Sequence, residues 1–333
     1  MKIYQKSWTE GIAESINGCS SIFILADSNL PVSYIDEVID ACGKSVPVFS
    51  HLLLGGEGLK TLDQAESIYQ TLNEVGADRR TLFICLGGGT MTDLGGYVAS
   101  TFKRGVKLVL LPTTLLAMVD AAIGGKNGVN LKTPQGLLKN QIGTFYLPDF
   151  VGLNVDWLES LPGRELKSGW AEMIKHALIN GDMTFLERVL KCDKEDLHKL
   201  IPESAQIKAN IVNQDPLETG IRASLNLGHT VAHALESVCE DLRHGEAVAY
   251  GLAFTLYASN HRTECIDPIL NGIEKTLELP EVDEIWGVMV KDKKNTSGNV
   301  TDVMYNGNDI DVNFIWNKNE FTKKWDDFRK KHS

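Results

Sequence analysis

The segment TLFICLGGGTMTDLGGYVASTFKRGVKLVLLP, residues 81–112, sets the expected architecture of the first half of the chain. An apolar, β-rich run ends in Gly87-Gly88-Gly89-Thr90, a helical stretch follows to Phe102, and a second apolar run begins at Val106. Parallel strands need a helical crossover, so this order predicts a parallel sheet. The glycine turn would let a diphosphate approach backbone amides at the positive end of the next helix. An ordinary tight turn is the alternative, because the full GxGxxG spacing is missing.

The alternation of apolar β-rich runs and helical stretches also occurs in the flanking sequence, and it ends near residue 155. Apolar β-rich runs cover residues 21–27 and 48–54, and Leu62, Ala65, Tyr69 and Leu72 recur between strands at helical spacing. After residue 155 long helical patterns follow, apart from a predicted hairpin around Asn306-Gly307-Asn308. We therefore predict two domains, a Rossmann-like α/β domain with a parallel sheet over residues 1–155 and a mainly α-helical domain over residues 156–333. A cleft between them is the expected ligand site.

Composition excludes several classes of protein. The net charge of −11 argues against binding to nucleic acid or to an anionic membrane surface. No apolar run approaches the roughly 18 residues of a membrane helix, and the first residues lack the apolar core of a secretory signal. The six scattered cysteines form no CxxC pair and are expected to be reduced. We expect a cytoplasmic enzyme that captures any anionic ligand with local positive charge.

Three histidines and one glutamate are candidate metal ligands. His229 and His233 lie four residues apart in NLGHTVAHALE, His244 follows soon after, and Glu172 lies in a separate amphipathic helix. Two imidazoles and one carboxylate leave a coordination position open, as a catalytic zinc ion requires. The helical spacing alone favours His229 and His233 as the imidazole pair. Ordinary core or surface histidines are the alternative.

A set of cations is unusual in so acidic a chain. Each lies within or beside a motif-like segment such as GGKNG or GIRASLN, and together they could hold a substrate that carries carboxylate and phosphate groups. Taken singly, each is more simply a solvated side chain. They are Arg104, Lys126, Lys139, Lys175, Lys208 and Arg222.

A connected series of motifs resembles the dehydroquinate synthase family. The series comprises GGGTMTDLGGYVASTFKRGVKLVLLPTTLLAMVDAAIGGKNGVN, LLKNQIGTF, GWAEMIKHALI, DPLETGIRASLNLGHTVAHALE and HGEAVAYG, and it spans roughly residues 55–250. The resemblance implies the fold of that family. It also implies zinc or cobalt bound by Glu172, His229 and His244, with His233 as a substrate-side partner in place of the pairing favoured by spacing.

The resemblance further implies catalytic NAD and a set of contacts. Nucleotide contacts would be Asp27, Glu57, Lys60, Gly88, Gly89, Thr90, Asp93, Thr113, Thr114, Lys126, Lys139 and Ser160. Substrate contacts would be Arg104, Asp120, Lys126, Asn140, Lys175, Lys208, Arg222, Asn226, His233 and Lys294, the last of which Lys293 could replace. The segment between Lys126 and Lys139 is longer than in the shorter form of the family, so its path is left open.

The implied activity converts 3-deoxy-D-arabino-heptulosonate 7-phosphate to 3-dehydroquinate and phosphate, a step of the shikimate pathway to aromatic amino acids. Such an enzyme is a phosphate-eliminating lyase, and a homodimer is expected by analogy. Another sugar-phosphate cyclase would keep the metal and NAD parts. A metal-dependent polyol dehydrogenase would share the fold but has little use for so many cations. A non-catalytic NAD- or metal-binding regulator would require a broken site.

Overall fold

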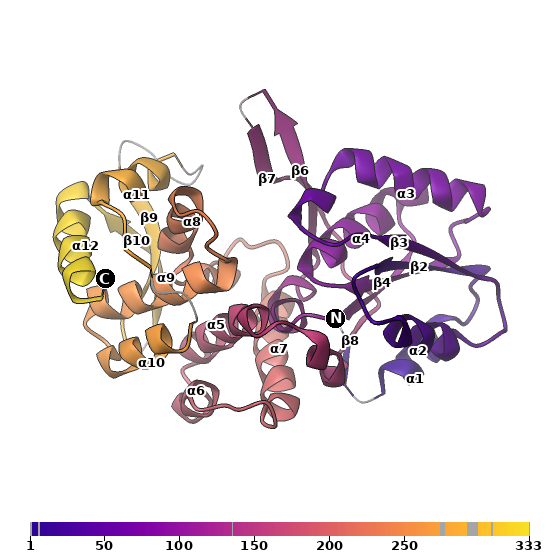
Figure 1. The fold of residues 1–333 in the computed structure, drawn as a ribbon, viewed down its shortest axis with the longest axis horizontal. Coiled ribbons are helices and arrows are strands. Elements are labelled where there is room, and N and C mark those ends of the chain that lie inside the picture. Colours follow the sequence, from indigo (N-terminus) through magenta and orange to yellow (C-terminus); the bar gives the residue numbers. More distant parts are fainter. Residues whose placement is uncertain are drawn as a thin grey trace. The chain divides into compact units, whose positions relative to one another are not determined.

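The computed structural model describes residues 2–5, 7–134, 136–273, 277–291, 299–307 and 309–332. The chain forms two compact units, which Figure 1 colours along the sequence. The first unit contains Met1–Pro162 together with Ile201–Ala209, and the second contains Gly163–Leu200 and Asn210–Ser333. Within the described part of the chain, no helix combines the length and apolar character that crossing a membrane requires.

A six-stranded parallel sheet forms the centre of the first unit, as the sequence predicted. Its order is β1-β8-β5-β4-β2-β3, and all of its pairings are parallel. The strands are β1 (Lys2–Tyr4), β2 (Ser21–Asp27), β3 (Val48–Leu53), β4 (Thr81–Gly87), β5 (Lys107–Pro112) and β8 (Phe150–Gly152). Strands β1 and β8 were not predicted, because three-residue strands carry no periodic signal and form only through pairing with their neighbours.

Helices cover both faces of this sheet (Figure 1). Helices α1 (Trp8–Ser15) and α2 (Val32–Cys42) pack on one face, where Ile24 and Ile84 contribute to the core. Helix α4 (Gly89–Thr101) packs on the other face, close to Phe83 and Cys85. Strands with apolar residues on both faces read as continuous apolar runs, which explains why β2 and β4 were visible in the sequence.

Helix α3 (Leu62–Glu74) forms at the predicted position. Its buried residues are Ala65, Ile68 and Leu72. Leu62 was expected on the packed face, but it is 43% exposed at the first helical position.

A two-stranded antiparallel hairpin follows the central strands of the first unit (Figure 1). Strands β6 (Lys126–Thr133) and β7 (Gly136–Phe145) include the segment whose path the sequence had left open. No hairpin was predicted, because β7 is exposed along most of its length and lacks an apolar alternation. Asn127 anchors the base of the hairpin by donating to the carbonyl oxygens of Gly125 (2.9 Å) and Tyr146 (3.0 Å).

The second unit is mainly helical, again as predicted. Its helices are α5 (Gly163–Asn180), α6 (Met183–Leu190), α8 (His229–Val238), α9 (His244–Ser259), α10 (Ile266–Asn271), α11 (Val282–Met289) and α12 (Lys318–His332), while α7 (Leu197–Gln214) contributes to both units. Helix α9 is apolar around most of its circumference and nearly all buried, as expected for a central helix. Phe254 of α9 packs against Phe321, Trp325 and Phe328 of α12.

The hairpin predicted near the C-terminus is confirmed. Strands β9 (Val300–Tyr305) and β10 (Ile310–Trp316) pair antiparallel. Of its predicted turn, Asn306 and Gly307 are described, with Gly307 at a φ of 89°, whereas Asn308 lies outside the described residues. The positive φ at Gly307 agrees with the reason for predicting a turn at this position.

Replacing Asn127 by Ala tests the anchor of the β6–β7 hairpin. The substitution removes the Asn127 donor from both carbonyl oxygens, of which that of Gly125 keeps the amide of Tyr146 as a donor. We expect a loss of about 1–3 kcal/mol in the free energy of unfolding. Urea denaturation followed by circular dichroism measures the loss. Asn73→Ala, at an exposed position near the end of α3, is the control and should change stability little. Equal effects of the two substitutions would contradict the anchoring role.

Candidate functional site

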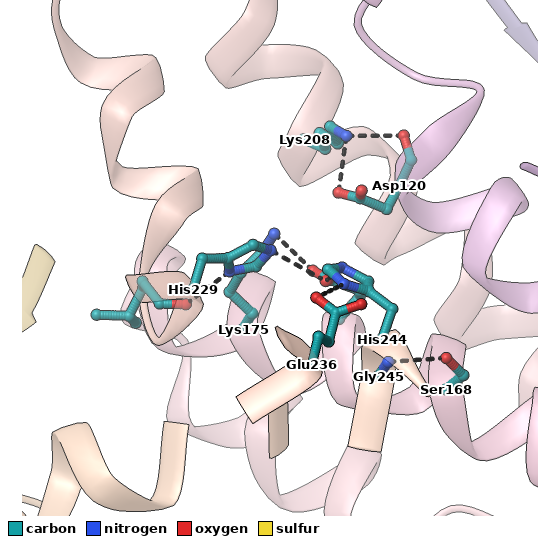
Figure 2. Close-up of polar contacts among 10 residues, drawn as sticks. Asp120, Ser168, Lys175, Lys208, His229, Glu236, His244 and Gly245 are labelled. Atoms are coloured by element: carbon teal, nitrogen blue, oxygen red, sulfur yellow. Dashed lines mark hydrogen bonds and ion pairs between the residues drawn. The ribbon is translucent and has the colours of Figure 1, made fainter. Parts of the chain in front are cut away.

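Three helices of the second unit bring one carboxylate and two imidazoles together. Glu172 comes from α5, His229 is the first residue of α8, and His244 is the first residue of α9. Their potential ligand atoms all lie within 4.8 Å of one another. Glu172 Oε1 lies 3.5 Å from His229 Nε2 and 3.3 Å from His244 Nε2. Figure 2 shows the two imidazoles approaching this point from different helices.

In each imidazole, the hydrogen bond of Nδ1 determines whether Nε2, which faces Glu172, can offer a lone pair. His229 Nδ1 lies 3.1 Å from the carbonyl oxygen of Leu227. A carbonyl only accepts hydrogen bonds, so Nδ1 carries the proton and Nε2 directs a lone pair toward Glu172. His244 Nδ1 lies 3.2 Å from Glu236 Oε2 in the same manner. When both imidazoles are neutral, two lone pairs and a carboxylate oxygen face one point, and such a set of acceptors requires a proton or a metal ion between them.

The pKa values of the three groups agree with this requirement. Burial alone would raise the pKa of Glu172, but the positive charge of Lys175 and the contact with His229 hold it well below its usual value. Burial and the Lys175 ammonium lower the pKa of His229, which keeps that imidazole neutral. Burial also disfavours the charged form of His244, yet its hydrogen bonds with Glu172 and Glu236 outweigh burial and raise its pKa to about 10. A proton or a metal ion can supply the positive charge that the set requires.

This donor set fits a divalent metal ion. Carboxylate oxygen and neutral imidazole nitrogen are the ligands that zinc accepts, and three protein ligands leave one position for a substrate. Both imidazoles have a hydrogen-bond partner on the nitrogen that faces away from the site, which is typical of metal-binding histidines. The three residues match the set implied by the family resemblance. They come from three helices, whereas the helical spacing had favoured His229 and His233 as the pair.

Close packing of the helices fixes the site. The amide of Gly245 donates to Ser168 Oγ at 2.9 Å, and a Cβ at Gly245 would collide with the backbone of Ser168. A Cβ at Gly251 would likewise collide with the carbonyl oxygen of Gly228. Glycine at these positions therefore lets α9 approach both α5 and the start of α8.

An ion pair adds a second constraint on the start of α9. Arg164 of α5 binds Glu246 through Nε (2.5 Å) and through its terminal guanidinium group (2.7 Å). Glu246 also accepts from the amide of Arg243, which immediately precedes the helix, at 2.9 Å. The side chain of Glu246 is only 1% exposed. These bonds hold the backbone next to His244 in place.

His233 lies beside the group of potential ligands and not within it. Its ring centroid is 5.5 Å from that of His229 and 6.3 Å from that of His244. His233 is exposed, whereas His229 is buried. An exposed imidazole next to a metal-binding set is well placed to exchange a proton with a substrate.

Other predicted substrate contacts of the second unit each have a polar partner within the protein. Lys175 lies 2.5 Å from Glu172 Oε2, and both side chains are buried. Arg222, also buried, donates to the carbonyl oxygen of Pro216 at 2.7 Å. Asn226 donates to Glu218 at 3.2 Å.

Asp215 organises the loop that carries Arg222. Its carboxylate accepts from the amides of Thr219 (2.9 Å), Gly220 (2.7 Å) and Arg222 (3.0 Å). These backbone donors, that of Thr219 foremost, lower the pKa of Asp215 to about 2. The sequence alone indicates no role for Asp215, because its hydrogen-bond partners become apparent only when the loop is folded.

The glycine turn of the first unit lies between β4 and α4, as predicted. No side chain caps the start of α4, so its first amides can face an anion. A Cβ at Gly88 would come within 3.0 Å of Thr114 Cγ2, and one at Gly89 within 3.1 Å of Ala121 Cβ. The turn therefore offers bare backbone beside Thr114, which fits the diphosphate of a dinucleotide.

Asp27 ends strand β2 and forms a local turn. Its Oδ1 accepts from the amides of Asn29 (2.9 Å) and Gly55 (3.1 Å). A Cβ at Gly55 would collide with the Asp27 carboxylate. The turn is therefore an Asx turn, which does not by itself indicate a nucleotide contact.

Lys60 is the centre of a polar network in the first unit. It is 4% exposed, and its Nζ lies 2.6 Å from both Asp93 Oδ2 and Asn140 Oδ1. Asn130 Nδ2 donates to Glu57 Oε1 at 2.7 Å, and Asn130 Oδ1 accepts from the backbone amide of Asn140 at 2.9 Å. Burial raises the pKa of Asp93, while the Lys60 ammonium opposes that rise. Four of these five residues were predicted contacts, and Asn130 was missed because only the fold of the hairpin brings it here.

A second ion pair of the first unit joins Lys208 to Asp120. Lys208 Nζ lies 2.7 Å from both the carbonyl oxygen and Oδ1 of Asp120, as Figure 2 shows. Asp120 lies in a π-helical turn, η3 (Ala117–Ala121), a geometry that is frequent at functional sites.

The remaining predicted contacts lie apart from these networks. Thr90 lies in the first turn of α4, and Thr113 donates its amide to Gly87 at 3.0 Å. Lys294 and the alternative Lys293 lie outside the described residues. Of these remaining contacts, Arg104, Lys126, Lys139 and Ser160 are exposed.

Comparisons with known proteins agree with this geometry. A family model described as 3-dehydroquinate synthase N-terminal matches residues 50–168, and one described as 3-dehydroquinate synthase C-terminal matches residues 169–295. The 3-dehydroquinate synthase of Leptospira interrogans is 38% identical over 91% of this chain and 88% of its own length. That of Parabacteroides distasonis is 34% identical over 92% and 91%, respectively.

Among solved structures, 2-deoxy-scyllo-inosose synthase complexed with carbaglucose-6-phosphate, NAD+ and Co2+ has a TM-score of 0.83 at 25% identity. The alignment covers 97% of this chain and 95% of that one. The fold is thus that of the sugar-phosphate cyclases, and the chain is an enzyme of this class. The chain belongs to the 3-dehydroquinate synthase family.

Gly245→Ala tests whether close approach of α5 and α9 is required. The added Cβ would collide with the backbone of Ser168, which can move only with its helix. We expect a loss of about 1–3 kcal/mol in the free energy of unfolding, measured by urea denaturation. Gly287→Ala in α11 is the matched control, because a Cβ there meets nothing within 4 Å. The control should be neutral or gain about 0.5–1 kcal/mol from helix propensity. A stable Gly245→Ala variant would show that the helices can separate freely.

Proposed function

We propose that this chain is a 3-dehydroquinate synthase that converts 3-deoxy-D-arabino-heptulosonate 7-phosphate to 3-dehydroquinate and phosphate, using NAD and a divalent metal ion. The convergence of Glu172, His229 and His244 on one point carries the proposal, because this acceptor set requires a cation. Membership of the 3-dehydroquinate synthase family supplies the reaction. In chemical class the enzyme is a lyase that eliminates phosphate.

The metal ion would be held by Glu172 and by the Nε2 atoms of His229 and His244. When bound, zinc or cobalt would acidify a substrate hydroxyl and polarise the ketone formed from it. Lys175 places a buried positive charge beside Glu172 and keeps that carboxylate ionised for binding. The carbonyl oxygen of Leu227 keeps the proton of His229 on Nδ1, so that its Nε2 remains available.

NAD would bind the first unit at the glycine turn and would accept and return one hydride in each cycle. The amides at the start of α4 would face its diphosphate, with Gly88, Gly89 and Thr90 forming the turn. Lys60 would order Asp93 and Asn140 around the ligand. The proposed nucleotide set also includes Asp27, Glu57, Thr113, Thr114, Lys126, Lys139 and Ser160.

Substrate recognition would divide between carboxylate and phosphate. Arg222 would bind the carboxylate through its planar guanidinium group, on the loop that Asp215 organises. The departing phosphate would be stabilised by Arg104, Lys126, Asn140 and His233, with His233 holding a proton at a ring nitrogen. The remaining contacts would be Asp120, Lys175, Lys208, Asn226 and Lys294.

The proposal keeps the remaining sequence predictions. Residues 1–155 would bind NAD, and residues 156–333 would bind the metal ion and the substrate. A cytoplasmic location and a homodimer belong to the same proposal.

Purified protein supplied with the heptulosonate phosphate, NAD and zinc tests the reaction. We expect phosphate release equal to substrate consumed, with no lasting absorbance of reduced nicotinamide, because the hydride returns to the product. A colorimetric phosphate assay and absorbance spectroscopy follow the two quantities. Glucose 6-phosphate is the control substrate, because the structural neighbour was solved with a carba analogue of it. Turnover of the control alone would indicate a different cyclase, and reduced NAD accumulating without phosphate would indicate a dehydrogenase.

Two histidine substitutions test the division between ligand and substrate partner. His244→Ala removes a proposed ligand and should weaken zinc binding by at least about 100-fold. This is more than the usual effect of losing a residue that only hydrogen-bonds a ligand. His233→Ala should retain zinc and lower kcat by about 10²–10⁴-fold, as expected for the loss of a proton donor or acceptor. Metal content after dialysis and steady-state kinetics provide the two measurements. Similar zinc loss in both variants would make His233 a ligand.

A further inference from the structure

Glu236 lies on the same face of α8 as His229, two helical turns later in the sequence. Its Oε2 is 3.2 Å from His244 Nδ1, and its side chain is 17% exposed. Figure 2 shows Glu236 directed at the imidazole of His244. Helix α8 thus contributes the potential ligand His229, and through Glu236 it also contacts the potential ligand His244 of α9.

The two nitrogens of His244 face two different carboxylates. Nε2 lies 3.3 Å from Glu172, whereas Nδ1 lies 3.2 Å from Glu236. The ring therefore separates Glu236 from the set of Glu172, His229 and His244, of which Glu236 is not a member. This position excludes Glu236 as a direct ligand of the same ion and makes it a partner of the ligand.

His244 needs such a partner more than the other two residues do. Its side chain is 31% exposed, compared with 11% for His229 and 0% for Glu172. The backbone at the start of α9 is fixed by Ser168 and Arg164, but these bonds do not restrain rotation of the His244 side chain. A partly exposed ring can turn away from the ion or place its proton on the wrong nitrogen.

We propose that Glu236 is the positioning residue of the metal centre. Its carboxylate holds the proton of His244 on Nδ1, so that the Nε2 lone pair remains directed at the ion. Its negative charge also makes the imidazole a stronger electron-pair donor to the metal ion. His229 obtains the same orientation from the Leu227 carbonyl oxygen, which is neutral. The inference rests on the proposed function, in which His244 is a metal ligand.

Glu236→Gln tests this role with little change of shape. The neutral amide accepts less strongly and adds no negative charge, and zinc affinity should fall about 10–100-fold, as is typical for outer partners of metal ligands. Affinity is measured on chelator-stripped protein by competition with a chromophoric zinc chelator. The visible spectrum of the Co2+-loaded protein provides a second readout, because it responds to the geometry of the ligands. We expect its bands to shift or weaken in the variant.

Glu240→Gln is the matched control, because Glu240 is exposed just beyond the end of α8 and the chemical change is identical. Its zinc affinity and Co2+ spectrum should equal those of the unaltered protein. Glu236→Asp, which keeps the charge on a shorter side chain, should bind zinc more tightly than Glu236→Gln if charge contributes. Circular dichroism on all variants separates a folding defect from a binding defect.

The outcomes separate this inference from the function on which it rests. If the unaltered protein binds zinc and Glu236→Gln binds it equally tightly with the same Co2+ spectrum, the positioning role is overturned while the proposed function stands. If the unaltered protein does not bind zinc, both are overturned. Weaker binding by a folded Glu236→Gln protein, with Glu240→Gln unaffected, supports the positioning role.

Discussion

The positive charge required among Glu172, His229 and His244 is the constraint on which the second unit depends. A carboxylate that is 0% exposed faces the lone pairs of two imidazoles at 3.5 and 3.3 Å. With both imidazoles neutral this arrangement would be repulsive, and burial would make the repulsion worse because few water molecules can screen it, so either a proton on His244 or a metal ion must supply positive charge. Lys175 neutralises one side of the carboxylate, and a divalent ion would satisfy the other. The same divalent ion would also polarise a substrate oxygen in the proposed reaction.

The packing of the helices of the second unit holds Glu172, His229 and His244 close together. Gly245 lets α9 approach α5, and Gly251 lets it approach the start of α8. The Arg164–Glu246 pair then fixes the first turn of α9, so that His244 starts from a defined backbone position. Rigid elements supported by a second layer of bonds hold a site more accurately than loops do. The proposed role of Glu236 completes this layer at the one ligand that packing leaves partly exposed.

In the proposed function the first unit binds an anionic dinucleotide, although the net charge of the protein is −11. It would do so locally, through the amides that follow Gly88 at the start of α4 and through the buried Lys60, which pairs with Asp93. The β6–β7 hairpin contributes Asn130 and Asn140 to that network. Backbone dipoles and single buried cations act over short distances, so the overall negative field does not prevent them from binding a diphosphate.

The sequence by itself determined the central strands, the glycine turn, the helical second half and the identity of most candidate residues. These features have local signals, because apolar runs, glycine turns and helical periodicity reflect the conformation of neighbouring residues. The family resemblance had already implied His244 in place of His233 as a ligand, and the structure shows His244 facing Glu172. Only the tertiary structure decided that Asn130, Asp215 and Glu236 support the sites. The short strands β1 and β8 and the β6–β7 hairpin also depend on their partners. The physical reason is the same in each case: contacts between residues distant along the chain depend on how helices and strands pack, and no local pattern records that packing.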